Sequence, residues 1–152
     1  MNLQVQNSSH PLLSCADGVV VRLTDLILVL GRIALAAVFI VTASYGNPTA
    51  ATLAGHGWPA PEVWSVIARM CEFAFGFGLI LGLATRYAAL LGIIYVLIAS
   101  FSAHLWWTYP AGQQGNMYAH FMKNTAIIGG LLAILVIGAG RWSIDAMLSR
   151  KS

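Results

Sequence analysis

Ionisable and amide side chains stand inside the long apolar stretches of this 152-residue sequence. An Arg, Lys or Asp at the centre of a bilayer costs roughly 2.5 to 3.5 kcal/mol on insertion scales, so such groups face one another or a wet cavity. The place where they meet is therefore the candidate site. The residues are Arg32, Arg69, Glu72, His104, His120, Lys123 and Asn124.

Arg32, Arg69 and Glu72 could form a buried charge pair. Arg32 and Glu72 reach similar depths if their segments run antiparallel, and an arginine binds a carboxylate through charge-assisted hydrogen bonds. Arg69 stands three residues before Glu72, so a pair within one helix competes with the first. The sequence leaves both pairings open, and also leaves open whether these residues bind a ligand or only hold helices together.

His120, Lys123 and Asn124 are spaced to share one helix face, and His104 falls at a similar depth on the preceding stretch. Together with Arg32 and Arg69 they would give the cavity an excess of positive charge over Glu72. That excess disfavours a metal cation and favours an anion or a carbonyl-bearing ligand such as a quinone. We expect no metal site. Snorkelling of His120 and Lys123 toward the membrane surface is the alternative.

The elements that position these residues are membrane helices. The sequence is 59% hydrophobic and only 9% charged, with a mean hydropathy of +0.77, against roughly 25% charged residues in a soluble domain. About 20 apolar residues are needed to cross a bilayer. We therefore predict an all-α, integral membrane four-helix bundle with spans near residues 25–45, 63–83, 87–107 and 118–138.

The expected domain organisation is one membrane domain at residues 23–140 between two short tails. Residues 1–22 read as a loose cytoplasmic tail and residues 141–152 as an interfacial tail, in which Ser143 caps a short helix with Asp145 in its first turn. Only Thr85 and Arg86 clearly separate the second and third spans, which predicts a tight antiparallel hairpin.

Basic residues outside the spans fall on one side, which places both termini in the cytoplasm by the positive-inside rule. A cluster of Trp and Tyr residues would then form an outer aromatic belt, and the polar site would open outward as a dead-end pocket. The net charge of +3 reflects this bias and calls for no nucleic-acid partner. The basic residues are Arg22, Arg86, Arg141, Arg150 and Lys151.

Cys15 and Cys71 are the two cysteines, and the expected spans put them at different depths. No disulfide is expected, and the sequence has no C-x-x-C motif of a thiol-disulfide oxidoreductase. Cys71 reads as a small buried packing residue.

From about Leu30 to Leu148 the sequence resembles the DoxX family of small four-span bacterial membrane proteins. The residues that carry the resemblance are Gly31, Arg32, Glu72, Gly82, Leu83, Thr85, Arg86, His104, the run from His120 to Asn124, Gly140, Arg141, Ser143 and Asp145.

The resemblance implies a four-helix bundle in the bacterial cytoplasmic (inner) membrane. Some relatives are associated with thiosulfate oxidation to quinone or with membrane complexes that handle thiol and oxidative stress. The positions that transfer are Arg32, Glu72, Arg86, His104, His120, Lys123 and Asn124, with roles unassigned. Where the family's first helix often ends in Gly-Lys, this sequence reads Ala43 to Gly46 without a lysine.

Two functions fit these residues. The first is the membrane subunit of a quinone-linked oxidoreductase, with Glu72, His104 and His120 handling protons and with Arg32, Arg69, Lys123 and Asn124 binding the ligand. No haem, flavin or iron–sulfur motif is evident, so a partner redox subunit would supply electrons. The second is a non-enzymatic anchor or a small anion or proton carrier. Neither reading fixes the oligomeric state, and a homo-oligomer fits both.

Overall fold

The computed structural model describes residues 11–46 and 48–150, and within these residues all regular structure is helical. Four helices are long and apolar enough to span a membrane, which confirms the predicted fold class. The elements are α1 (Pro11–Ser44), α2 (Ala50–Gly55), α3 (Pro61–Leu81), α4 (Thr85–Ala103), the short 3₁₀ helix η1 (Trp106–Thr108), α5 (Ala111–Ile137) and α6 (Ile144–Ser149).

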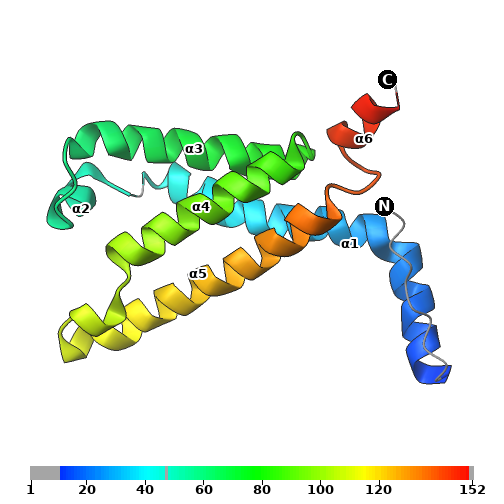
Figure 1. Cartoon of the computed structure of the whole chain (residues 1–152), viewed down its shortest axis with the longest axis horizontal. Coiled ribbons are helices and arrows are strands. Elements are labelled where there is room, and N and C mark those ends of the chain that lie inside the picture. The colour runs from blue at the N-terminus through cyan, green and yellow to red at the C-terminus, as the bar shows by residue number, and fades with distance from the viewer. Residues whose placement is uncertain (1–10, 47, 151–152) are drawn as a thin grey trace.

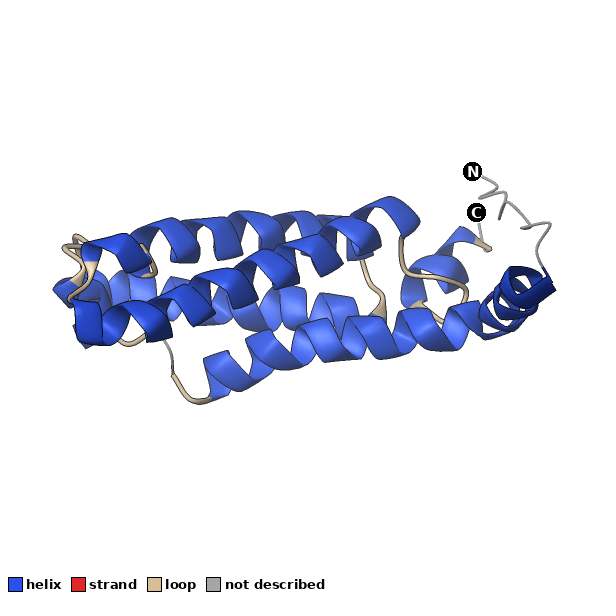
Figure 2. Ribbon diagram, turned by 90° about the horizontal axis from the view of Figure 1, so that it is seen from below, coloured by secondary structure: helices blue, strands red, loops and turns tan. Residues whose placement is uncertain are grey.

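The helices pack as two pairs, α1 with α3 and α4 with α5, joined by the α3–α4 hairpin. In Figure 1, α3 and α5 come close at the end where the hairpin turns and diverge toward the end that carries α2. Figure 2 shows the long helices running roughly parallel in the perpendicular view. The bundle is therefore tight at one end, here called the closed end, and splayed at the other, here called the open end.

The first helix begins earlier than the sequence suggested. We expected a loose tail up to residue 22, whereas α1 is helical from Pro11; residues 1–10 lie outside the described residues. The dark blue start of α1 turns away from the bundle in Figure 1. Val19, Val20 and Val21 continue the apolar run toward the N-terminus and are exposed, as for side chains that face lipid.

A compact apolar core lies between the four helices. Phe39 of α1 meets the ring of Phe75 on α3 edge-on at 4.7 Å and that of Tyr95 on α4 at 6.5 Å. Leu79 and Leu131 are fully buried beside them. Large apolar side chains fill this layer, so the core separates the closed end from the open end.

Asp145 fastens the C-terminal segment to the α3–α4 hairpin. Its two carboxylate oxygens accept the backbone amides of Ala84 and Thr85, at 2.7 and 2.9 Å, and so cap the first turn of α4. Burial alone would raise the pKa of the Asp145 carboxyl, but these hydrogen bonds and the charge of Arg32 outweigh it and hold the pKa below its ordinary value. Ser143 caps α6, as predicted, by accepting the amide of Ala146.

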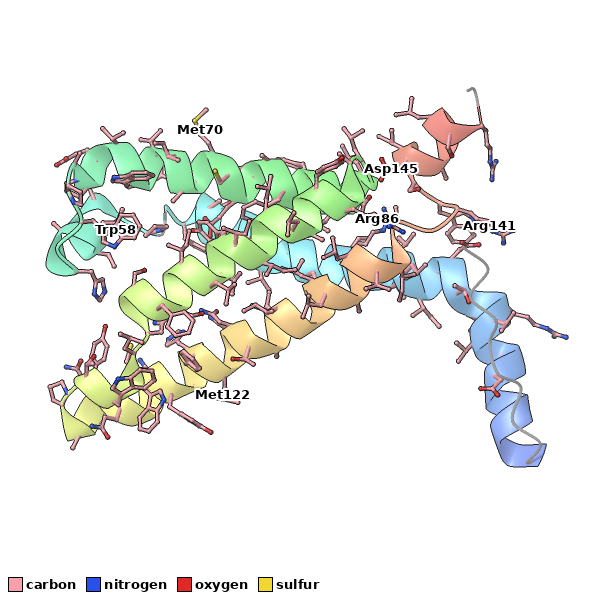
Figure 3. The ribbon with its side chains drawn as sticks, viewed as in Figure 1. Trp58, Met70, Arg86, Met122, Arg141 and Asp145 are labelled. Atoms are coloured by element: carbon pink, nitrogen blue, oxygen red, sulfur yellow. The ribbon has the colours of Figure 1, made fainter. Side chains whose placement is uncertain are left out.

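Asp25 and Arg141 add a second link at the same end. The Asp25 carboxylate accepts from the backbone and the guanidinium of Arg141, with the ion pair at 2.7 Å, and raises the pKa of Arg141. Arg86 reaches the carbonyl of Val136 in the last turn of α5. Figure 3 shows Arg86, Arg141 and Asp145 gathered at this end of the bundle.

The hairpin turn differs from the prediction by about two residues. Gly82 adopts φ +64° and ends α3, so the turn is Gly82–Ala84, and Thr85 already belongs to α4. From the sequence we predict the separation at Thr85 and Arg86. The left-handed glycine, rather than polarity, ends the helix here.

Gly82 also leaves room for the buried guanidinium of Arg32. A Cβ placed on Gly82 would lie 2.0 Å from Nη1 of Arg32 and 2.5 Å from Cβ of Ser143. Arg32 is 1% exposed and donates from Nη2 to the carbonyl of Trp142 at 2.7 Å. Arg32 therefore belongs to the closed end. The expected pair between Arg32 and Glu72 is wrong, because the two side chains have partners at opposite sides of the apolar core.

We predict that Gly82→Ala destabilises the protein strongly, by well over the ~1 kcal/mol typical of a strained left-handed position, because the methyl group also displaces Arg32. The measurement is the thermal midpoint of the detergent-solubilised protein. Gly129→Ala is the matched control, since a Cβ there meets nothing within 4 Å. Equal midpoints for the two variants would contradict the close approach.

We predict that Asp145→Asn lowers the free energy of unfolding by about 1 kcal/mol at neutral pH, the usual cost of a lost helix cap. Because the folded-state pKa of Asp145 is depressed, this contribution exists above the ordinary aspartate pKa and disappears as the pH falls through the lower folded-state value. The stability difference between wild type and Asp145→Asn should thus vanish in acid. A stability difference between the two proteins that persists in acid would contradict the role of the ionised Asp145 carboxylate as the cap of α4. Glu62→Gln, on an exposed residue of α3, is the control.

Candidate functional site

A cavity of about 580 Å³ occupies the open half of the bundle and touches α1 to α5. Most of its wall is apolar, with Phe39, Phe75 and Trp64 among the lining side chains. Pockets of this size enclose small organic ligands. The side chains on its wall that can hydrogen-bond or ionise are Thr42, Thr52, His56, Trp58, Trp64, Cys71, Glu72, Tyr95, Ser102, His104, Tyr109, His120, Lys123 and Asn124.

Glu72 lies on the side of the cavity where α3 packs against α1. It shares the inward face of α3 with Ser65 and Leu79, and this packing brings it to α1. The Thr42 hydroxyl donates to Oε1 of Glu72 at 2.9 Å, and Tyr95 interacts with the same carboxyl group from α4. Oε2 finds no hydrogen-bond partner among the described residues, although Glu72 is only 4% exposed. On this side, the cavity wall thus carries a hydrogen-bond acceptor, Oε2 of Glu72, that has no donor among the described residues.

A second polar cluster comes from α4 and α5. The rings of His104 and His120 stack with centroids 5.1 Å apart, and the Lys123 ammonium lies 3.3 Å from Nδ1 of His120. Asn124 donates to the hydroxyl of Ser100 at 3.0 Å and is buried. The spacing of His120, Lys123 and Asn124 does bring them to one helix face, and all three line the cavity with His104.

Five of the seven candidate residues therefore line one cavity, and the two arginines do not. Arg32 is at the closed end. Arg69 contacts the loop that follows α1, where its Nη2 is 3.4 Å from the carbonyl oxygen of Gly46. Its charge still acts on Glu72, but no ion pair joins them within the described residues. The expected excess of positive charge is thus wrong, since Lys123 and Glu72 balance when the histidines are neutral.

Sequence reasoning missed Thr42, His56, Tyr95 and Tyr109, and it misplaced Cys71. Thr42 and Tyr95 are ordinary in membrane helices, and only packing reveals that both face Glu72. His56 lies in the loop that we expect to face outward, at the side where the polar site opens. That position was the one feature of the sequence that could have indicated its place at the cavity. Cys71 is exposed on the cavity wall instead of buried in packing.

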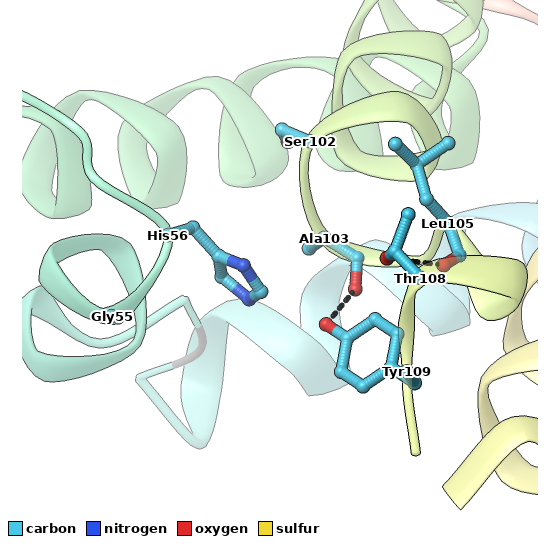
Figure 4. A pocket seen from close by; sticks show the side chains of 7 residues that line it. All are labelled: Gly55, His56, Ser102, Ala103, Leu105, Thr108 and Tyr109. Atoms are coloured by element: carbon cyan, nitrogen blue, oxygen red, sulfur yellow. Dashed lines mark hydrogen bonds between the residues drawn. The ribbon is translucent and has the colours of Figure 1, made fainter. Parts of the chain in front are cut away.

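A smaller hollow of about 260 Å³ lies at the end of the bundle, between α2 and the end of α4 with η1. It shares His56, Ser102, Ala103 and Tyr109 with the main cavity. Figure 4 shows His56 directed toward Ala103 and Tyr109, whose hydroxyl donates to the Ala103 carbonyl at 2.9 Å. This hollow forms a mouth at the open end.

The donor set suits an organic ligand better than a metal ion. Among residues 11–46 and 48–150, no three His, Cys, Asp or Glu side chains come together as metal ligands. The cavity offers an unsatisfied carboxylate oxygen on one side and the imidazole, ammonium and amide groups of α4 and α5 on the other. Such an arrangement can bind a flat polar head group at two edges and can exchange protons with it.

Four membrane-spanning helices with a cavity in one half define a small multi-pass membrane protein. The DoxX family model matches residues 27–105, and the chain belongs to the DoxX family. It is similar to two proteins of Escherichia coli strain K12, whose names place them in the inner membrane. The chain is accordingly a multi-pass protein of the bacterial inner membrane.

Inner membrane protein YphA is 30% identical over 126 residues, which cover 78% of this chain and 88% of that protein. Inner membrane protein YqjF is 33% identical over 135 residues, covering 86% and 98%. The Surfeit locus protein 4 homolog of Drosophila melanogaster is 29% identical over 86 residues, which are 55% of this chain and 32% of that protein. No solved structure matches the chain.

We predict that Thr42→Val lowers the free energy of unfolding by about 1 to 3 kcal/mol, because it removes the hydroxyl that donates to Oε1 of the buried Glu72. Thr125→Val is the matched control, since the Thr125 hydroxyl bonds only within its own helix, to the carbonyl of Phe121. Thermal unfolding in detergent provides the comparison. A Thr42→Val protein as stable as Thr125→Val would mean that this hydrogen bond is dispensable.

Proposed function

We propose that this protein is the membrane subunit of a quinone-linked oxidoreductase system and that its cavity binds the quinone head group. The observation that carries the proposal is the unpaired Oε2 of Glu72 on the wall of a largely apolar cavity. A buried acceptor without a donor costs about 1 to 3 kcal/mol, so a ligand that donates to it is favoured. A quinol hydroxyl is such a donor.

The cluster on α4 and α5 supplies what the oxidised ligand needs. A quinone carbonyl accepts hydrogen bonds, and the Lys123 ammonium and the imidazoles of His104 and His120 can donate them. Reduction adds two electrons and two protons to a quinone. Glu72 and the histidines line the same cavity, so they are placed to deliver or take up those protons.

Charge favours an uncharged ligand over a free anion. Arg32 and Arg69 were the reason to expect an anion, and neither lines the cavity. With Lys123 balanced by Glu72, the remaining attraction for an anion is weak, whereas two carbonyl oxygens still find donors. A small sulfur compound or thiol would then be the electron donor and would be bound by a partner protein.

The topology supports access from the outer side. Arg86 and Arg141 lie together at the closed end (Figure 3), and Trp58, Trp106 and Tyr109 lie at the open end. By the positive-inside rule the closed end and both termini are cytoplasmic. The apolar core and the Arg32 contacts block a path to that side, which disfavours the alternative of a carrier.

The test is binding of a short-tailed ubiquinone and of its reduced quinol to the purified protein in detergent, measured by quenching of tryptophan fluorescence, since Trp58 and Trp64 line the cavity. We predict that Glu72→Gln weakens binding of the quinol about tenfold and that Lys123→Met weakens binding of the oxidised quinone about tenfold, the loss expected for one charge-assisted hydrogen bond. The matched controls are Glu62→Gln and Arg22→Met, on exposed residues outside the cavity.

Unchanged binding in both cavity variants would place the quinone elsewhere. No binding to folded wild-type protein would contradict the proposal and would favour an anchor for a partner enzyme. Electron transfer is tested separately, by adding thiosulfate or thiols in the presence of membrane extract, because the chain carries no redox motif of its own.

A further inference from the structure

The cavity is open sideways as well as at its mouth. Its wall includes the deeply buried Glu72 and Asn124, and also side chains on the outer surface of the bundle. Ile67 on α3 is 40% exposed, and Leu91 and Ile98 on α4 are 57% and 50% exposed. These residues lie within the membrane-spanning helices, so what they meet outside the protein is lipid.

The exposed members form two facing rims. Ile67, Cys71 and Ala74 follow one another at helical spacing along α3, and Leu91, Ile94 and Ile98 do so along α4. All six are exposed and all six line the cavity. We call the space between the two rims the α3–α4 groove.

The groove results from how the hairpin is built. Near the turn the helices touch closely, since a Cβ on Gly78 would lie 3.1 Å from Cβ of Ala88. Farther from the turn, the cavity lies between the two rims. Glu72 and Tyr95, which point inward from these helices, lie directly behind the groove.

We propose that the α3–α4 groove is a lateral portal through which an isoprenoid quinone enters from the lipid, and that its hydrocarbon tail stays in the groove while the head reaches Glu72. This inference rests on the proposed quinone function. It adds the route by which the quinone enters and the class of quinone, one with an isoprenoid tail. An apolar tail on a polar head group suits a lipid-facing apolar slot that is continuous with a buried polar pocket.

The expected gain from the tail is modest. Moving an alkyl chain from lipid into an apolar groove removes no apolar surface from water, so only packing contributes. At equal mole fraction in the membrane, a long-tailed quinone should therefore bind about tenfold more tightly than its head group alone, not by many orders of magnitude.

Cys71 is a native reporter on the rim of the groove. The sequence has two cysteines, so Cys15→Ser leaves Cys71 as the single thiol. In nanodiscs of this variant, Cys71 should react with a lipid-dissolved maleimide, and a long-tailed ubiquinone should slow the reaction. The ring of ubiquinone is fully substituted, which limits its own addition to the thiol. The comparison ligand is the same ring with a methyl group in place of the tail.

Ala74→Phe tests the portal itself, because Ala74 is an exposed rim residue next along α3 from Cys71. It should reduce binding of the long-tailed quinone about tenfold more than it reduces binding of the head group alone. Ala133→Phe, on the exposed face of α5 and outside the cavity, is the matched control.

The outcomes separate the two proposals. Equal binding of both ligands, with no effect of Ala74→Phe beyond that of Ala133→Phe, would overturn the portal and leave the quinone function standing. Absence of binding by either ligand would overturn both. A Cys71 that resists the lipid-dissolved maleimide but forms a disulfide-linked dimer on oxidation would show that a second copy covers the groove, and would also overturn the portal.

Discussion

The buried guanidinium of Arg32 is the constraint on which the arrangement of the helices depends. It fits only because Gly82 has no side chain, and it reaches the C-terminal segment through the Trp142 carbonyl. Asp145 then returns from the same segment to cap α4. One cation and one carboxylate thereby hold α1, the α3–α4 turn and the chain after α5 together. In an apolar medium such polar contacts fix geometry more firmly than apolar packing, because breaking them leaves further unpaired groups away from water.

Fastening one end in this way allows the other end to stay open. The apolar layer around Phe39 and Leu79 separates the two regions, and beyond it the helices diverge around a cavity. The polar residues of the chain divide accordingly. At the closed end, Asp25, Asp145 and Nη2 of Arg32 have hydrogen-bond partners, although Nε and Nη1 of Arg32 have none among the described residues. Glu72 and the cluster of His104, His120 and Lys123 instead line a space that no described side chain fills. This second set is where the proposed ligand would bind.

The sequence predicted the fold well, since four apolar runs separated by Gly and Pro leave few alternatives. It also predicted that His120, Lys123 and Asn124 act together, because they share a helix face at fixed spacing. Arg32 shows what it could not predict. The similar depths of Arg32 and Glu72 on two antiparallel helices made a pair between them reasonable. The partner of Arg32 is instead a backbone carbonyl 110 residues away. Every residue has such a carbonyl, so the sequence does not indicate which one an arginine will contact. The sequence did not reveal Tyr95 and Thr42 as neighbours of Glu72 for a related reason. Which way a side chain points depends on how the helices are rotated against one another.

The central claim is that a quinone head group binds between Glu72 and the histidine and lysine cluster. Photolabelling with an azido-substituted quinone in nanodiscs, followed by peptide mass spectrometry, tests it most directly. The account predicts labels on the cavity-lining parts of α3 and α4, between Trp64 and Phe75 and between Leu91 and His104, and their loss when unlabelled quinone competes. Labels that resist competition, or that fall on lipid-facing residues of α5 such as Leu132 and Val136, would contradict it.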